Sequence, residues 1–105
     1  MITKLSDHIR LNQDRWYKGT IYQSEHMLVG IDCLVAGQSQ APHQHRGHDK
    51  MYYVQSGTAK FIIGTHEAIA ESGMVVIAPA DTIHSVANVG TDPLILLIAM
   101  APEPK

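Results

Sequence analysis

The sequence predicts an all-β fold, an antiparallel sandwich or barrel built from many short strands. Gly and Pro recur at short intervals along the 105 residues. The segments between them are rich in Val, Ile, Tyr and Leu and are too short for stable helices. No window keeps a helical repeat over three turns, and only residues 6–17 are ambiguous. Short strands at this spacing are typical of β-sandwiches and barrels.

Six segments are predicted as strands and two more are weaker candidates. The six are Met27–Val35, Met51–Gln55, Ala59–Ile63, Met74–Ala78, His84–Asn88 and Leu94–Met100, and the weaker two are Thr20–Gln23 and His66–Ala70. In Met74–Ala78 and Leu94–Met100 apolar residues occupy both alternating faces, so both faces are expected to be buried. Such burial in a one-domain barrel indicates a covering segment or a second subunit. We therefore expect a homodimer in which Met1–Leu5 adds an edge strand.

Composition limits the class of protein. Hydrophobic residues make up 45% and charged residues 17%, with a formal net charge of −2, which predicts one folded domain over residues 1–105. The eight Lys and Arg residues are scattered singly, so no nucleic-acid partner is expected. The longest apolar run, Leu94–Ala101, is far shorter than the ~20 residues of a membrane helix. The first ten residues contain no apolar stretch like that of a signal peptide. Because the single cysteine, Cys33, cannot form an internal disulfide, we expect a cytoplasmic protein with a small buried thiol.

Three of the seven histidines form a candidate metal site. His43 and His45 are separated by one residue, so in an extended chain both rings project from the same face. Two neutral imidazoles in this arrangement can hold one divalent cation, and the alternative is a pair of exposed loop histidines. His84 opens a predicted strand that would complete the site by pairing nearby. Three other histidines have no partner at ligand spacing and are expected at the surface: His8, His26 and His66.

The spacing around these histidines resembles the two motifs of the cupin superfamily. The first motif, G-x5-H-x-H-x3,4-E-x6-G, is matched at Gly37, His43, His45 and Gly57. The second motif, G-x5-P-x-G-x2-H-x3-N, is matched at Gly73, Pro79, His84 and Asn88. Asp81 stands where this motif has its middle glycine. The turn is therefore expected either to use a different backbone conformation or to keep a left-handed one, which Asp tolerates better than most residues. The chain is similar to the small single-domain bacterial cupins with a type-2 conserved barrel.

This resemblance implies the fold and the cofactor. The fold is an antiparallel double-stranded β-helix, or jelly-roll barrel, with core motifs at residues 37–57 and 73–88 and residues 1–26 as an N-terminal strand or cover segment. The cofactor is one divalent metal ion at a three-histidine site made by His43, His45 and His84. Fe, Mn, Ni and Zn all remain open as its identity.

The glutamate of the first motif is missing. Counting back from the motif's last glycine places Lys50 at its position, and an ammonium group repels a dication. Asp49 fits the shorter motif spacing, and His48 shares strand parity with Lys50. His48 and Asp49 are therefore both candidate fourth ligands. A bulge would be needed to turn Asp49 inward.

The parity of the strand after this position places Lys50, Tyr52 and Val54 in the barrel lumen and Met51 and Tyr53 on its outside. Lys50 and Tyr52 are therefore candidate catalytic or substrate-binding residues. Lys50 is expected to turn toward the mouth of the barrel and pair with Asp49, Asp81 or a bound carboxylate. The alternative is a metal-free pocket in which the histidines bind an anion beside Lys50.

The resemblance implies a metal-binding protein that acts on a small oxygenated molecule, as a dioxygenase, an isomerase or a decarboxylase. The alternative is a non-catalytic protein that binds or senses a small molecule. The sequence contains no nucleophile-elbow, P-loop or dinucleotide-binding motif. Three aromatic residues that precede the motifs are expected either to roof the pocket or to pack in the core or at a subunit contact: Trp16, Tyr17 and Tyr22.

Overall fold

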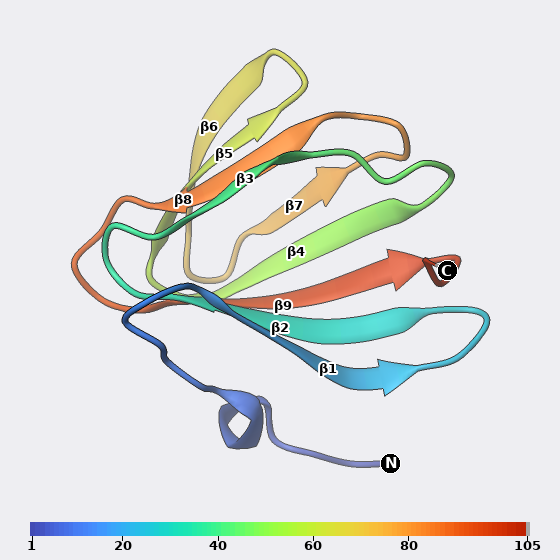
Figure 1. The fold of residues 1–105 in the computed structure, drawn as a ribbon, viewed down its shortest axis with the longest axis horizontal. Helices are drawn as coiled ribbons and strands as arrows, with labels where there is room; N and C mark the ends of the chain where they lie inside the picture. The colour runs from blue at the N-terminus through green and yellow to red at the C-terminus, as the bar shows by residue number, and fades with distance from the viewer. Residues whose placement is uncertain (105) are drawn as a thin grey trace.

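In the computed structural model, which describes residues 1–104, nine antiparallel strands form two facing sheets (Figure 1). The five-stranded sheet has the order β1 (Tyr17–Gln23), β2 (Leu28–Leu34), β9 (Leu94–Ala101), β4 (Asp49–Ser56), β7 (Val75–Ala78). The four-stranded sheet has the order β3 (Ser39–His43), β8 (His84–Asn88), β5 (Thr58–Ile63), β6 (His66–Glu71). This is the all-β jelly-roll architecture that the sequence predicts.

All six predicted strands are present with ends within two residues of the prediction, and both weaker candidates are strands as well. The prediction missed β3, because Gly37 and Pro42 suggested a turn. Pro42 is tolerated because β3 is an edge strand and its register with β8 shifts between Gln40 and His43. The ambiguous segment 6–17 contributes three residues to a four-residue 3-10 helix, η1 (Leu5–His8), and its last residue, Tyr17, begins β1.

The core between the sheets is built by alternation along the strands. On β4, Lys50, Tyr52 and Val54 are buried, whereas Met51 and Tyr53 on the opposite face are only partly buried. The predicted parity of this strand is therefore confirmed. The side chains of Tyr52 and Phe61 meet edge to face with their ring centroids 4.9 Å apart, a favourable geometry for two aromatic rings.

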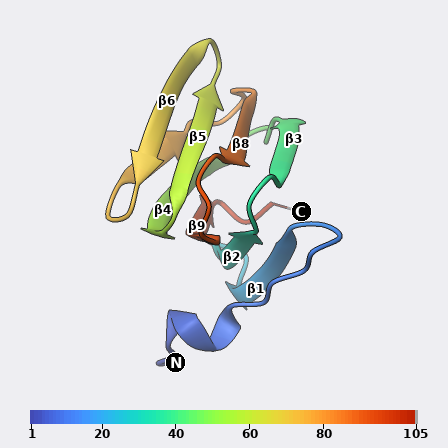
Figure 2. The ribbon, with the colours of Figure 1, turned by 90° about the vertical axis from the view of Figure 1, so that its left-hand side faces the viewer.

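A second, smaller apolar cluster lies on the outer face of the five-stranded sheet. Ile31 and Cys33 of β2 and Ile95 of β9 form its centre, and Leu5 and Ile9 from the N-terminal segment pack over them. Figure 2 shows η1 outside the sandwich, next to β1. The outer face of β9 is thus buried at Ile95 within one chain, whereas Leu97 and Ala99 on the same face are only partly buried. The prediction that both faces of Leu94–Met100 are buried therefore holds in part. Cys33 is buried as predicted, and this burial raises the pKa of its thiol.

The outer face of β7 has no such cover. Val75 and Ile77 are 55% and 52% exposed, so the prediction that both faces of Met74–Ala78 are buried is wrong for the single chain. Within residues 1–104, Met1–Lys4 belong to no strand and Leu5 begins η1. No helix among these residues is long and apolar enough to cross a membrane.

Candidate functional site

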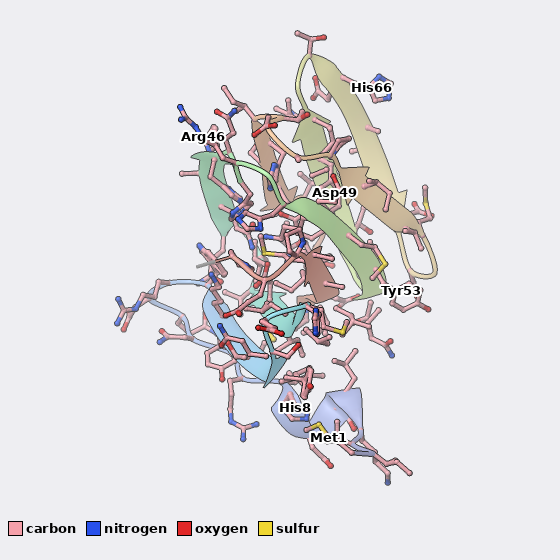
Figure 3. All side chains as sticks on the ribbon, turned by 90° about the vertical axis from the view of Figure 1, so that its right-hand side faces the viewer. Met1, His8, Arg46, Asp49, Tyr53 and His66 are labelled. Carbon is pink, nitrogen blue, oxygen red and sulfur yellow. The ribbon has the colours of Figure 1, made fainter. Side chains whose placement is uncertain are left out.

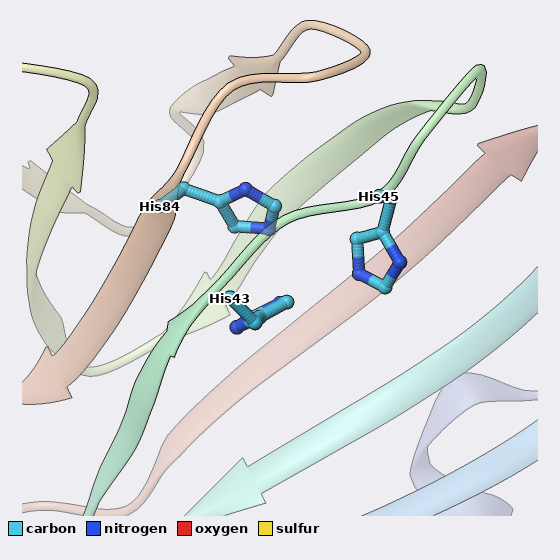
Figure 4. A group of neighbouring side chains, drawn as sticks. All are labelled: His43, His45 and His84. Atoms are coloured by element: carbon cyan, nitrogen blue, oxygen red, sulfur yellow. The ribbon is translucent and has the colours of Figure 1, made fainter.

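Three histidine side chains converge where β3 ends and β8 begins (Figure 4). His43 and His84 are direct partners in the antiparallel register of β3 and β8, which places their side chains next to each other. His45 lies two residues beyond β3, in the loop that leads to β4. The ring centroids are 4.2 Å apart for His43 and His84, 4.9 Å for His43 and His45, and 5.5 Å for His45 and His84. One nitrogen from each ring lies within 4.8 Å of the other two.

The hydrogen bonds of the rings determine which nitrogen faces the centre. His43 Nδ1 lies 2.9 Å from the carbonyl oxygen of Ala41, and His84 Nδ1 lies 3.0 Å from that of Thr82. A carbonyl only accepts, so in either ring Nδ1 carries a proton, and in the neutral form of the ring Nε2 carries the lone pair. His84 Nε2 and His45 Nε2 are buried and have no hydrogen-bond partner among the described residues. Metal-binding histidines are commonly oriented by such a backbone carbonyl.

Burial keeps two of these rings neutral. The pKa of His45 is lowered to about 4, mainly by burial and further by the positive charge of Lys50. The pKa of His84 is also lowered, again mainly by burial, although its hydrogen bond to the Thr82 carbonyl opposes the shift. Both rings are therefore neutral at pH 7, the form that binds a metal ion.

A cavity of about 220 Å³ lies beside the rings, lined by Trp16, Lys18, Asp32, Gln40, His43, His45 and Lys50. Lys50 is only 6% exposed, and its Nζ lies 4.6 Å from the centre of the Tyr52 ring, within the range of a cation–π contact. Asp32 is buried on β2, and its Oδ2 accepts a 2.6 Å hydrogen bond from Gln40 Nε2. Burial lowers the pKa of Lys50, and the charge of Asp32 opposes that shift.

Residues 30–100 match the cupin domain family. The chain belongs to this family. A solved structure of the protein TT1209 from Thermus thermophilus is 38% identical, covers 98% of both chains and superposes with a TM-score of 0.93. An uncharacterised protein of Streptomyces coelicolor, SCO3923, is 32% identical over 83 residues, which is 77% of this chain and 76% of the relative.

A predicted oxalate decarboxylase from Thermotoga maritima has a TM-score of 0.85 over 97% of this chain and 99% of its own. Its identity to this cupin is 18%, so the likeness shows the shared fold alone.

Neither candidate fourth ligand of this cupin joins the three rings. The Nδ1 atom of His48 lies 2.9 Å from the Pro102 carbonyl oxygen, so this ring is held against the C-terminal segment. Asp49 Oδ1 accepts a 2.9 Å hydrogen bond from the amide of Ala80. Lys50, in contrast, lines the cavity beside His43 and His45. Within residues 1–104, the cluster of metal-ligating side chains is therefore limited to the three histidines.

Tyr52 is buried below Lys50 and does not line the cavity. Its hydroxyl oxygen has no hydrogen-bond partner among the described residues, and burial raises the pKa of this hydroxyl. Trp16 lines the cavity, in agreement with the prediction that it roofs the pocket. Tyr17 packs on the outer cluster, and Tyr22 is exposed.

Sequence reasoning missed the polar residues that face Lys50. Asp32 and Gln40 are buried and joined by a hydrogen bond, and Lys18 reaches the same cavity. A signal for Asp32 was present, because it is the one charged residue of the apolar segment Met27–Val35. A carboxyl group on a strand buried on both faces requires a polar partner.

The other histidines lie away from the site. His8 is on η1 and His66 is at the start of β6, near opposite ends of the molecule (Figure 3). His26 and His66 are exposed, as predicted, whereas His8 is partly buried and its Nε2 lies 2.8 Å from Thr3 Oγ1.

Asp81 links the loop that contains His45 to the loop that precedes β8 through two hydrogen bonds. Its backbone amide donates to the carbonyl of His45 at 3.0 Å, and its Oδ1 accepts from the amide of Gly47 at 3.1 Å. The φ of Asp81 is 66°, so of the two conformations left open by the sequence this residue adopts the left-handed one, which glycine adopts most easily. Asp81 therefore supplies both the backbone geometry of glycine and a side-chain acceptor that glycine lacks.

Asp81→Ala is expected to destabilise the protein by about 1–2 kcal/mol, because Ala is strained at positive φ and cannot accept from Gly47. Asp81→Gly is the matched control: it relieves the backbone but loses the acceptor, and the two effects are each of order 1 kcal/mol. We expect Asp81→Gly to stay within about 0.5 kcal/mol of the parent in urea unfolding. Equal losses in the two variants would contradict a role for the backbone conformation.

The lowered pKa of His45 predicts a pH dependence of stability for the metal-free protein. Between pH 6.5 and about 4 the unfolded chain binds a proton on this ring and the folded chain does not. The free energy of unfolding is therefore expected to decrease as the pH falls through this window. Asp32 has the opposite effect on the free energy of unfolding. Burial raises its pKa, so as the pH falls the folded chain binds this proton before the unfolded chain does.

Urea unfolding at several pH values checks this prediction, with His45→Gln as the matched control. The variant keeps Asp32 but lacks the ring, so its free energy of unfolding should fall less steeply between pH 6.5 and about 4 than that of the parent. Identical slopes for parent and variant would contradict the prediction.

Proposed function

We propose that this cupin binds one divalent transition metal ion through Nε2 of His43, His45 and His84. The observation that carries the proposal is the pair of buried Nε2 atoms, on His45 and His84, that lack a partner beside a third ring. A buried polar atom without a hydrogen bond is costly and rare. A cation bound among the three rings would satisfy both lone pairs.

The donor set suits Fe, Mn, Ni or Zn, since neutral imidazole binds each of these ions. With three protein ligands the ion keeps open positions, and when bound it supplies a Lewis acid that polarises an oxygen ligand. The protein's own residues shape the adjoining cavity: Trp16 forms part of its wall, and Lys50 places a positive charge in it.

We further propose that this site is catalytic and acts on a small oxygenated molecule, as a dioxygenase, an isomerase or a decarboxylase. Lys50 favours catalysis over simple binding. It is a buried amine in the cavity beside two of the rings, and burial lowers its pKa. A lysine with a lowered pKa releases its proton more readily than an exposed lysine, which a general acid requires.

Elemental analysis of protein purified without a metal-binding tag tests the proposal. We expect about one divalent ion per chain, either as purified or after reconstitution with Fe, Mn, Ni or Zn. Failure to retain any of the four ions would overturn the metal site. Retention without turnover of small hydroxy and keto acids, followed by NMR, would favour the alternative of a non-catalytic binding protein.

We also propose a homodimer. The outer face of β7, the edge strand of its sheet, presents Val75 and Ile77 to solvent, and exposed apolar edges are commonly covered by a symmetric partner. Light scattering at micromolar concentration is expected to give twice the mass of the chain. A monomer under these conditions would contradict the proposal. If the dimer uses β7, Ile77→Lys should weaken it, whereas Lys60→Met, on the other sheet, should not.

A further inference from the structure

The cavity beside the three histidines contains a buried positive charge. Lys50 lies on β4 between β9 and β7, opposite Met100 and Ala78, so its side chain leaves the sheet among apolar neighbours. It is 6% exposed and lines the cavity. A second lysine, Lys18, lines the same cavity from β1 and is exposed.

No acidic group of residues 1–104 forms an ion pair with Lys50 within 4.0 Å. The carboxyl group of Asp32 acts on Lys50 through its charge. One of its oxygens, Oδ2, accepts a hydrogen bond from Gln40. Burial moreover favours the neutral form of Asp32, because it raises the pKa of this carboxyl. A buried ammonium group without a close counterion is costly, so an anion that enters the cavity is favoured.

The metal site increases this preference. In the cupin motif the position of Lys50 belongs to a glutamate, whose charge offsets part of the charge of a bound dication. In this chain a bound dication and Lys50 would add their charges instead, and Lys18 places a further positive group in the same cavity. Fields of one sign inside a cavity attract ligands of the opposite sign.

We infer that the ligand of this cavity is a small carboxylate whose negative group pairs with the Lys50 ammonium. This inference rests on the proposed function, because the same carboxylate would occupy the site beside the metal ion. The volume of about 220 Å³ corresponds to about seven water molecules at ~30 Å³ each. A short-chain mono- or dicarboxylate therefore fits inside the cavity.

Calorimetric titration of malonate tests the inference, with malonamide as the neutral probe of similar shape. We expect metal-loaded protein to bind malonate at least about tenfold more tightly than malonamide, since charge-assisted hydrogen bonds are the stronger ones. Lys50→Met is expected to lose about tenfold or more in malonate affinity. Lys18→Met, which removes an exposed charge, should lose only about two- to threefold.

A Lys50→Met variant that binds malonate as tightly as the parent would overturn the inference, and so would equal affinity for malonate and malonamide. Lys50→Gln is the second variant if Lys50→Met does not fold, with the same expected loss. The same titrations on metal-free protein separate the two proposals. Lys50-dependent malonate binding without metal retention supports the anion site and overturns the metal site, whereas metal retention without malonate binding does the reverse.

Discussion

Replacing both His43 and His84 with Ala is expected to reduce the bound metal from about one ion per chain to less than about a tenth of that. The double variant retains one imidazole of the three, and a single imidazole does not hold a transition metal ion against exchange into buffer. Elemental analysis of the untagged parent and variant, prepared side by side, is the measurement.

His26→Ala is the matched control, because this side chain is 83% exposed and lies outside the three-histidine cluster. It should retain the metal content of the parent. Circular dichroism should show the same β content in all three proteins, since none of these histidines belongs to the apolar clusters. Unchanged metal content in the double variant would refute the assignment of the ligands.

Replacing Lys50 with Glu is expected to tighten metal binding by about tenfold or more. The exchange removes a positive charge from the cavity and restores a carboxylate at the position where the cupin motif has one. Attraction then replaces repulsion of the dication, an effect of several kcal/mol at short range in a partly buried site. Calorimetric titration of Mn(II) or Fe(II) into both forms is the measurement.

Lys50→Gln separates loss of the positive charge from gain of a carboxylate ligand. Its metal affinity should lie between that of the parent and that of Lys50→Glu. Thermal unfolding of each form is the necessary second measurement, because the new carboxylate faces buried Asp32. If Lys50→Glu binds metal no more tightly than the parent, then residue 50 does not face the ion or no ion binds. The same variant should lose affinity for malonate, so the two ligands are expected to respond in opposite directions.

The regular strands were predictable because their signal is local. The parity that buries Lys50, Tyr52 and Val54 follows from the two-residue repeat of a strand, and it holds along β4. The positive φ of Asp81 was one of two outcomes that the sequence left open, because Asp tolerates this conformation better than most residues but does not require it. The motif spacing predicted that the three histidines lie together. In the structure they do, because β3 and β8 pair in a register that places His43 opposite His84.

Other features depend on contacts between distant segments, and no local pattern contains them. The sequence predicted that Lys50 pairs with Asp49, Asp81 or a bound carboxylate. The carboxyl group whose charge acts on Lys50 is instead Asp32 of β2, which forms no ion pair with it within 4.0 Å. The side chain of Asp49 instead hydrogen-bonds to the backbone amide of Ala80, and that of His48 to the backbone carbonyl of Pro102. The outer face of β9 is covered by Leu5 of η1 and by Ile9, the residue after η1, both from the same chain. The apolar pattern on both faces of this strand predicted a cover, but it could not show whether the cover comes from the same chain or from a second subunit.

The burial of Cys33 beneath Leu5 and Ile9 has a practical consequence for kinetics. Cys33 is 1% exposed, and burial raises the pKa of its thiol, so a thiol reagent reacts only after the N-terminal segment detaches. Because this sulfur faces outward from the five-stranded sheet, its labelling rate reports the detachment of residues 5–10 rather than the opening of the barrel. The single cysteine is thus an intrinsic reporter that separates local from global unfolding without any engineered label.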